Sequence, residues 1–245
     1  MRRRTKRALR VPLALLLALC VGGAVYLGDY YRADEAAVAA MAAQSDAVYT
    51  ERRGDVTWFV PTEDITVGLI FYPGGKVEAA AYAPLLRAFA ARGILCALVE
   101  MPAHLAVLDA DAADGLPEAF PAVADWYIAG HSLGGVMAAR YAAAHADALA
   151  GLILLASYST SDLRTSGLRV LSILASEDGV LDAEAYESNR ANLPASAEEV
   201  TLQGACHAQF GSYGVQAADG QPTITGEEQV ERTAEAVGRF VTALH

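Results

Sequence analysis

The sequence predicts an α/β fold with a mainly parallel central sheet and helices on both faces. Short apolar segments of β-type composition alternate with segments of helical periodicity along most of the chain, which is the pattern of a parallel sheet covered by helices. Residues 67–72, Val-Gly-Leu-Ile-Phe-Tyr, form a continuous apolar run, typical of a strand buried on both faces. The length of 245 residues suits one domain of this class.

The expected strands and helices follow from composition and from turn residues. Two β-type runs, 47–52 and 56–60, flank Gly54 and predict a hairpin at the front, which makes the sheet mixed. Glu228 stands three residues after Thr225, the spacing of a capping box at the start of the last helix. The other expected strands are residues 67–72, 94–99, 126–129, 149–156, 169–175 and 198–202. The other expected helices are residues 33–43, 78–92, 132–146 and 182–192.

The N-terminal segment differs in composition from the rest of the chain. Residues 1–10 carry six positive charges and no negative one, and residues 11–28 form 18 residues without a charge. Such a run is the minimum for a membrane span and also fits a signal peptide. The basic flank should stay in the cytoplasm, so the remainder is expected outside it. Cleavage after Ala24, and hence secretion, is the alternative to an uncleaved anchor. The expected parts are an anchor or signal peptide at 1–28, a helical stalk or first helix at 29–45 and the α/β domain at 46–245.

Charge and cysteine content exclude several classes of function. The net charge of −11 becomes −17 once the six N-terminal cations are set aside. Such an acidic surface disfavours nucleic acid and anionic membranes as partners, so membrane contact is expected through the N-terminal segment only. Three cysteines do not make a disulfide framework. Cys20 lies in the apolar segment, and whether Cys96 and Cys206 pair is left open by their spacing.

Residues 127–135, Tyr-Ile-Ala-Gly-His-Ser-Leu-Gly-Gly, carry the strongest functional pattern. The motif Gly-x-Ser-x-Gly lies between an expected strand and an expected alanine-rich helix, the context in which it forms a nucleophile elbow. The turn forces Ser132 into strained backbone geometry, and Gly130 and Gly134 lack the Cβ atoms that would clash there. The alternative is a glycine-rich turn without chemistry. We predict that Ser132 is a catalytic nucleophile at the carboxyl edge of the sheet.

A serine nucleophile needs a base, and the base needs a carboxylate that orients it. In folds that carry this elbow, the chain order is serine, acid, histidine. Of the five histidines, His207 fits: two precede the serine, one ends the helix that the serine begins, and one is terminal. Asp178 follows the expected strand 169–175 and is the predicted acid, with Glu177 as the competitor. A packing role for His207 and a surface turn for the acidic pair are the alternatives.

Two backbone N–H groups are expected to stabilise an oxyanion. One is that of Leu133, directly after the nucleophile and at a helix N-terminus. The other is expected from the loop after residues 67–72, with Gly75 as first choice and Lys76 as second. A phosphate-binding loop is not expected, because Val77 stands where such a loop requires Ser or Thr. Neither a metal nor a cofactor is expected.

At these residues the chain resembles the α/β-hydrolases, most closely the small single-domain serine hydrolases related to dienelactone hydrolases and esterases. The resemblance covers about residues 56–244 and is carried by the loop at 73–75, the elbow at Ser132, the turn at Asp178 and the loop at 207–211. It implies a Ser-Asp-His triad, a covalent acyl-enzyme and no cofactor. Dienelactone hydrolases use a cysteine where this chain has Ser132, so lactone hydrolysis is not expected.

The resemblance also bears on access to the site. Many relatives insert a helical lid before the acid-bearing strand, whereas only residues 158–168 separate the corresponding strands here. We therefore expect an open site without a large cap domain. The expected reaction is hydrolysis of a carboxylic ester of a small molecule. The alternatives are acyl transfer or thioester hydrolysis on the same triad, and a catalytically silent, membrane-tethered binding protein.

Overall fold

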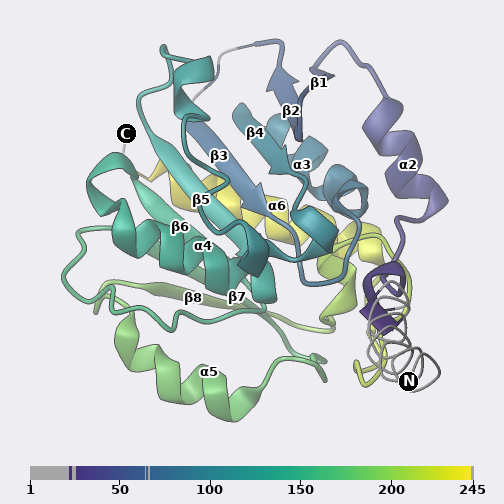
Figure 1. Ribbon diagram of the computed structural model, residues 1–245, viewed down its shortest axis with the longest axis vertical. Helices are drawn as coiled ribbons and strands as arrows, with labels where there is room; N and C mark the ends of the chain where they lie inside the picture. The colour runs from purple at the N-terminus through teal and green to yellow at the C-terminus, as the bar shows by residue number, and fades with distance from the viewer. Residues whose placement is uncertain (1–21, 24–25, 64, 66, 244–245) are drawn as a thin grey trace, which may run out of the picture. The chain divides into compact units, whose positions relative to one another are not determined.

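Eight strands form one sheet in the part of the chain that the computed structural model describes, residues 22–23, 26–63, 65 and 67–243. Their order is β1-β2-β4-β3-β5-β6-β7-β8 (Figure 1). The pairs β1–β2 and β2–β4 are antiparallel, and the other neighbouring pairs are parallel, which confirms a mainly parallel sheet with a front hairpin. The strands are β1 Val48–Arg53, β2 Val56–Pro61, β3 Val67–Tyr72, β4 Ile94–Val99, β5 Trp126–His131, β6 Gly151–Leu155, β7 Arg169–Ala175 and β8 Glu198–Leu202.

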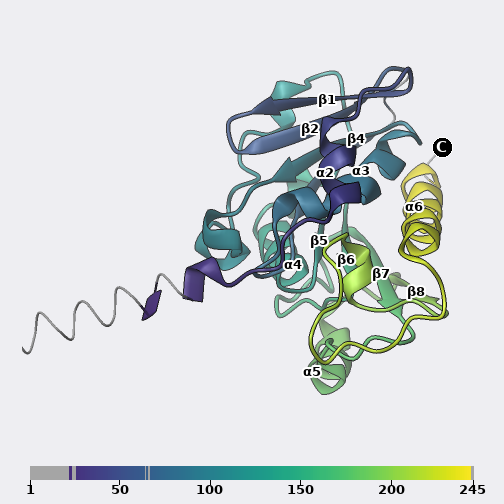
Figure 2. The same cartoon turned by 90° about the vertical axis from the view of Figure 1, so that its right-hand side faces the viewer.

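Helices cover both faces of the sheet (Figures 1 and 2). The helices α2, α3 and α6 lie on one face, and α4 and α5 lie on the other. Alternate residues of β3 serve the two cores: Leu69 and Phe71 pack under α3 and α6, and Ile70 and Tyr72 pack under α4. Both faces of this strand are therefore buried, which explains its unbroken apolar sequence. The α-helices are α2 Glu35–Ala42, α3 Ala83–Ala90, α4 Leu133–Ala144, α5 Ala183–Asn189 and α6 Gly226–Thr242.

The chain separates into two units at its N-terminal end, residues 1–30 and residues 31–245. The predicted anchor falls largely outside the described residues. Among the described helices, none combines the length and the apolar character that a membrane span requires. The helix α2 belongs to the second unit, where Ala37 is fully buried and the Asp34 carboxylate caps the first turn. It packs there as a first helix of the sheet-bearing unit.

Element boundaries differ from expectation where short turns replace helix. The bounds of β3, β4, β7 and β8 are as predicted. The helix expected at 78–92 is divided into a 3-10 turn, Ala79–Tyr82, and the shorter α3. Pro84 lies in the first turn of α3, where its missing N–H costs no helical hydrogen bond. At the start of α6 the Thr225 hydroxyl accepts from the Glu228 N–H at 3.1 Å, as the capping pattern predicts. Other 3-10 turns are Pro102–His104, Ala106–Leu108, Pro117–Ala119, Ala146–Ala148, Arg190–Asn192 and Ala208–Phe210.

The connection from β6 to β7 is irregular and contains no helix in residues 156–168, all of which are described. The expected absence of a large cap between these strands is thus confirmed. Cys96, in β4, and Cys206, in the loop after β8, are both buried free thiols. Burial raises the pKa of Cys96 well above its ordinary value and that of Cys206 to about 11, so both groups remain protonated at neutral pH.

Candidate active site

Ser132 lies in a sharp turn between β5 and α4, with φ +51° and ψ −125°. A non-glycine residue in such a sparsely populated region stores about 1–3 kcal/mol of strain. A Cβ atom on Gly130 would lie 2.5 Å from the backbone of Gly134, and one on Gly134 would lie 2.2 Å from the Pro73 carbonyl oxygen. These close approaches explain both glycines of the motif. The Ser157 hydroxyl, from the loop after β6, donates to the Ser132 carbonyl at 2.7 Å and braces the turn.

Asp178 and His207 meet from the loops after β7 and β8. The Oδ2 atom of Asp178 accepts a hydrogen bond from His207 Nδ1 at 2.8 Å, with both side chains buried. The Oδ1 atom accepts from the backbone N–H groups of Val180 and Leu181, each at 2.8 Å. Both carboxylate oxygens are thus held in place. Because a carboxylate only accepts hydrogen bonds, Nδ1 of a neutral His207 carries the proton and Nε2 carries a lone pair.

The Nε2 atom of His207 is buried and has no hydrogen-bond partner among the described residues. The Ser132 hydroxyl is therefore not bonded to it in this arrangement. Hydrogen bonds between a nucleophile and its base are commonly long in the free protein and shorten when substrate binds. The segment that carries Ser132 nevertheless lies close to His207, since the ring of His131, directly before Ser132, lies 4.4 Å from the His207 ring between centroids. The structure thus joins Asp178 to His207 and brings Ser132 to the same edge of the sheet.

His131 and Tyr82 form a buried pair behind this edge. The Tyr82 hydroxyl contacts His131 Nδ1 at 2.8 Å and accepts from the Gly74 N–H at 3.0 Å. Burial raises the pKa of Tyr82 well above its ordinary value, so its hydroxyl keeps a proton that it can donate to Nδ1. Burial lowers the pKa of His131 well below its ordinary value, and the neighbouring His207 lowers it further. His131 is therefore neutral at pH 7 and puts no positive charge beside His207.

The backbone amides of the loop after β3 decide between the two oxyanion candidates. The Lys76 N–H donates to the His104 carbonyl at 2.7 Å and is therefore engaged. The Gly75 N–H, like the Leu133 N–H in the first turn of α4, has no acceptor among the described residues. A Cβ atom on Gly75 would lie 2.8 Å from Leu133 Cδ2, so the two residues are in contact. The donors without an acceptor are therefore those of Leu133 and Gly75, which favours Gly75 over Lys76 as the second oxyanion candidate.

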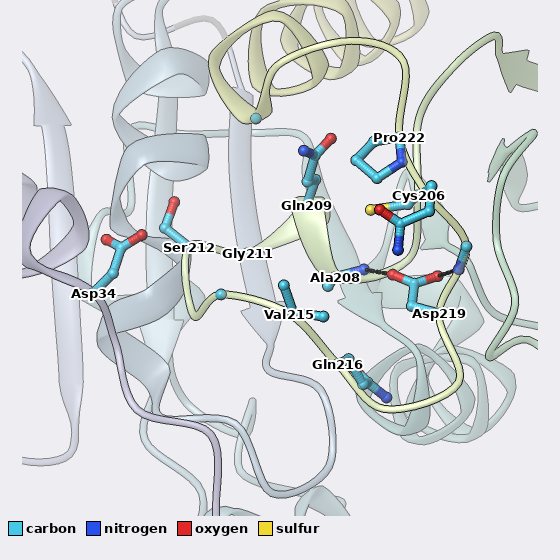
Figure 3. Close-up of a pocket in the computed structure, with 14 residues that line it drawn as sticks. Asp34, Cys206, Ala208, Gln209, Gly211, Ser212, Val215, Gln216, Asp219 and Pro222 are labelled. Carbon is cyan, nitrogen blue, oxygen red and sulfur yellow. Dashed lines mark hydrogen bonds between the residues drawn. The ribbon is translucent and has the colours of Figure 1, made fainter.

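Asp219 holds the loop that carries His207, a role that the sequence analysis missed. Its Oδ1 accepts from the His207 N–H at 3.2 Å and the Gly179 N–H at 3.1 Å. Its Oδ2 accepts from the Ala208 N–H at 2.8 Å (Figure 3). Burial alone would raise the pKa of Asp219, but these amides and the Cys206 thiol outweigh it, so the pKa lies below its ordinary value. The only sequence cue is an aspartate before a glycine, which is common in turns.

Replacement of Asp219 by asparagine should loosen the His207 loop, because the new NH₂ group faces backbone N–H donors. A displacement of about 1 Å at a catalytic group costs up to about a hundred-fold in rate, so kcat/KM for a p-nitrophenyl ester should fall ten- to a hundred-fold. Asp147→Asn, at an exposed aspartate, is the matched control.

The stability of the fold should also depend on the ionisation of Asp219. Because its pKa is lowered in the folded protein, the ionised carboxylate stabilises the fold at pH values above the ordinary aspartate pKa of about 3.9. This stability is lost as the pH falls through the lowered pKa. Acid unfolding followed by circular dichroism should therefore be shallower in Asp219→Asn; an unchanged acid limb would contradict this role.

Two cavities adjoin these loops. One of about 230 Å³ opens beside Ser132. A larger one, of about 300 Å³, is lined by Cys206, Ala208 and Asp219 among others (Figure 3), but by none of Ser132, Asp178 or His207. The smaller cavity is therefore the one that serves the candidate nucleophile. In the described residues, no group of three or more His, Cys, Asp or Glu side chains is placed to hold a metal ion.

Residues 68–231, more than half of the chain, match the α/β hydrolase family. The chain therefore belongs to this family, and its fold is the α/β-hydrolase fold without a large cap domain. No curated protein matches the sequence.

Solved structures share the fold at low sequence identity. A CIB-like hydrolase from Thermoplasma acidophilum has a TM-score of 0.56 and 14% identity, covering 79% of this chain and 99% of that one. The carboxylesterase CesB from Bacillus subtilis has a TM-score of 0.59 and 10% identity, covering 85% of this chain and 95% of that one. At such identities the similarity concerns the fold.

Proposed function

We propose that this α/β-hydrolase cleaves carboxylic esters through an acyl-enzyme formed on Ser132. The observation that carries the proposal is the Asp178–His207 hydrogen bond of 2.8 Å, which leaves a buried, unpartnered Nε2 at the edge where the strained elbow presents Ser132. A base oriented by a carboxylate, beside a serine in such a turn, is the arrangement that acyl transfer requires. The carboxylesterase among the structural neighbours supports an ester as the substrate.

In the proposed mechanism, His207 Nε2 removes the hydroxyl proton as Ser132 Oγ attacks the ester carbonyl carbon. The resulting oxyanion accepts hydrogen bonds from the N–H groups of Leu133 and Gly75. The protonated His207, stabilised by Asp178, then gives its proton to the departing alcohol, and the acyl group remains on Ser132. A water molecule, deprotonated by His207, repeats the attack on the acyl-enzyme. Collapse of the second intermediate releases the carboxylic acid and restores the serine. Histidine thus acts as base and acid in turn.

An alkyl fluorophosphonate tests the nucleophile directly, because it forms a covalent bond with a serine only where a base activates it. We expect one modification per chain, found by mass spectrometry in the peptide that contains Ser132, together with loss of p-nitrophenyl butyrate hydrolysis. Heat-denatured protein is the control and should not react. Modification of a different residue, or hydrolysis that continues in fully modified protein, would overturn the proposal. A folded protein without any modification would support the silent binding protein instead.

A further inference from the structure

The cavity of about 230 Å³ beside Ser132 is built from three segments that follow parallel strands. The first is the beginning of α4, the second is the loop after β6, and the third is the turn after β7 that carries Asp178. The residues that line it are Ser132, Leu133, Val136, Ala156, Ser157, Tyr158, Val180, Leu181 and Asp182.

The position of this cavity decides which half of an ester it receives. Of the two available oxyanion donors, Leu133 lines the cavity and Gly75, from the loop after β3, does not, so an oxyanion held between them lies at the margin of the cavity. The leaving alcohol must lie at His207 Nε2, because His207 protonates it, and His207 does not line the cavity either. A carbonyl carbon attacked by Ser132 carries one further substituent, the acyl chain. The cavity is therefore the place for the acyl chain.

The walls of the cavity indicate a neutral, aliphatic acyl chain. Val136 lies one helical turn after Ser132 and therefore on the same face of α4. Val180 and Leu181 form the wall from the β7 side, and no lysine or arginine lines the cavity. The Asp182 carboxylate accepts from the Ala185 N–H at 2.9 Å, where it caps α5. No cation is thus present to pair with a charged acyl group. The Ser157 hydroxyl is engaged with the Ser132 carbonyl, and the side chains of Val136, Val180 and Leu181 offer apolar surface to methylene groups.

The size of the cavity limits the length of that chain. Pockets that hold drug-sized ligands occupy about 300–1,000 Å³, and an apolar cavity of about 150 Å³ holds benzene, a molecule of six carbons. A space of about 230 Å³ therefore receives acyl groups of up to about eight carbons. Longer chains would have to leave the cavity and lie in water.

We propose that the cavity beside Ser132 selects neutral aliphatic acyl groups of about four to eight carbons, with Val136 and Leu181 setting the limit. The inference rests on the proposed esterase function. The backbone of this wall is held in place by the candidate acid, since the Leu181 N–H donates to the Asp178 carboxylate that orients His207. The contribution of Leu181 to chain-length selection is therefore that of its side chain, beside that of Val136.

The test is a series of p-nitrophenyl esters from acetate to dodecanoate, in which only the acyl chain changes. We expect kcat/KM to rise about two- to four-fold per methylene at first, because each buried methylene adds to transition-state binding. It should pass a maximum between about four and eight carbons and then fall. Leu181→Ala should move the maximum up by about two carbons, and Val136→Ala should do so to a smaller extent. Val38→Ala, a half-exposed valine of α2, is the matched control and should keep the wild-type profile.

A second series, acetate esters of alcohols of increasing length, distinguishes the two halves of the substrate. Its profile should be the same in wild type and Leu181→Ala; a change confined to this series would assign the cavity to the alcohol and overturn the inference. A wild-type maximum at ten carbons or more, or a flat acyl profile, would also overturn it. With each of these outcomes a fluorophosphonate would still label Ser132, and the proposed esterase function would remain. Absence of that labelling in folded protein would instead remove the proposed function, and this inference with it.

Discussion

Replacement of Ser132 by alanine should lower the kcat of p-nitrophenyl butyrate hydrolysis by about a million-fold. The effect is this large because the proposed covalent intermediate cannot form without the hydroxyl, and the remaining groups act only through binding and the oxyanion donors. The Ser132 side chain makes no hydrogen bond in the described structure, so its loss should leave folding intact. The thermal unfolding midpoint measured by calorimetry should therefore change by only a few degrees, about 4 °C or less.

Ser188→Ala is the matched control for this variant. Ser188 is exposed on α5, and its hydroxyl donates only to the Ala185 carbonyl within its own helix. The control should retain wild-type turnover and wild-type labelling by a fluorophosphonate. If Ser132→Ala hydrolysed the ester at more than about a thousandth of the wild-type rate, the chemistry would not depend on this serine as a nucleophile.

Asp178→Asn should lower kcat by about ten-thousand-fold, the second largest effect. The asparagine side chain keeps the shape of the turn, and its oxygen can still accept from the Val180 and Leu181 N–H groups. Its NH₂ group then faces His207 Nδ1 and donates to it, so the ring proton moves to Nε2. In that tautomer the Nε2 atom of His207 has no free lone pair and cannot accept the proton of the serine hydroxyl. Steady-state kinetics at pH 7 to 10 should show the loss, and folding should be preserved.

Glu177→Gln separates the two acids that the sequence left in competition. The Glu177 carboxylate accepts from the Ser176 hydroxyl at 2.9 Å and is exposed, and it makes no contact with His207 in the described structure. This variant should keep wild-type turnover. A large loss in Glu177→Gln together with near-normal activity in Asp178→Asn would show that the acid has been assigned to the wrong residue.

Patterns local in sequence predicted the larger part of the fold. The strand β3 could be predicted because burial on both faces requires an unbroken apolar run. The turn at Gly54 could be predicted because a tight reversal depends on adjacent residues. The need for glycine at both positions of the elbow could be predicted for the same reason, since the strand and the helix that approach each other there are joined within five residues. The division of the helix after β3 also has a local cue, since Pro84 is best accommodated in the first turn of a helix, but the prediction extended the helix through it.

The parts of the candidate site that the sequence missed or left open depend on contacts between segments that are separate in sequence. Asp219 holds the His207 loop through backbone amides, and backbone amides leave no trace in sequence. The choice between Gly75 and Lys76 depends on where the His104 carbonyl lies, and His104 belongs to a separate loop with a φ of +58°. Order along the chain predicted that Asp178 and His207 lie together, as they do, because the fold itself fixes which strand ends are adjacent.

The Tyr82 oxygen has a consequence for how the site moves. It accepts from the Gly74 N–H, next to the candidate oxyanion donor Gly75, and it bonds to the His131 ring, which lies against the His207 ring at an angle of 50°. Two segments of the candidate site that are well separated in sequence thereby share one hydrogen-bonding partner. We therefore expect a displacement of the Tyr82 side chain to shift the Gly74 backbone and the His131 ring together.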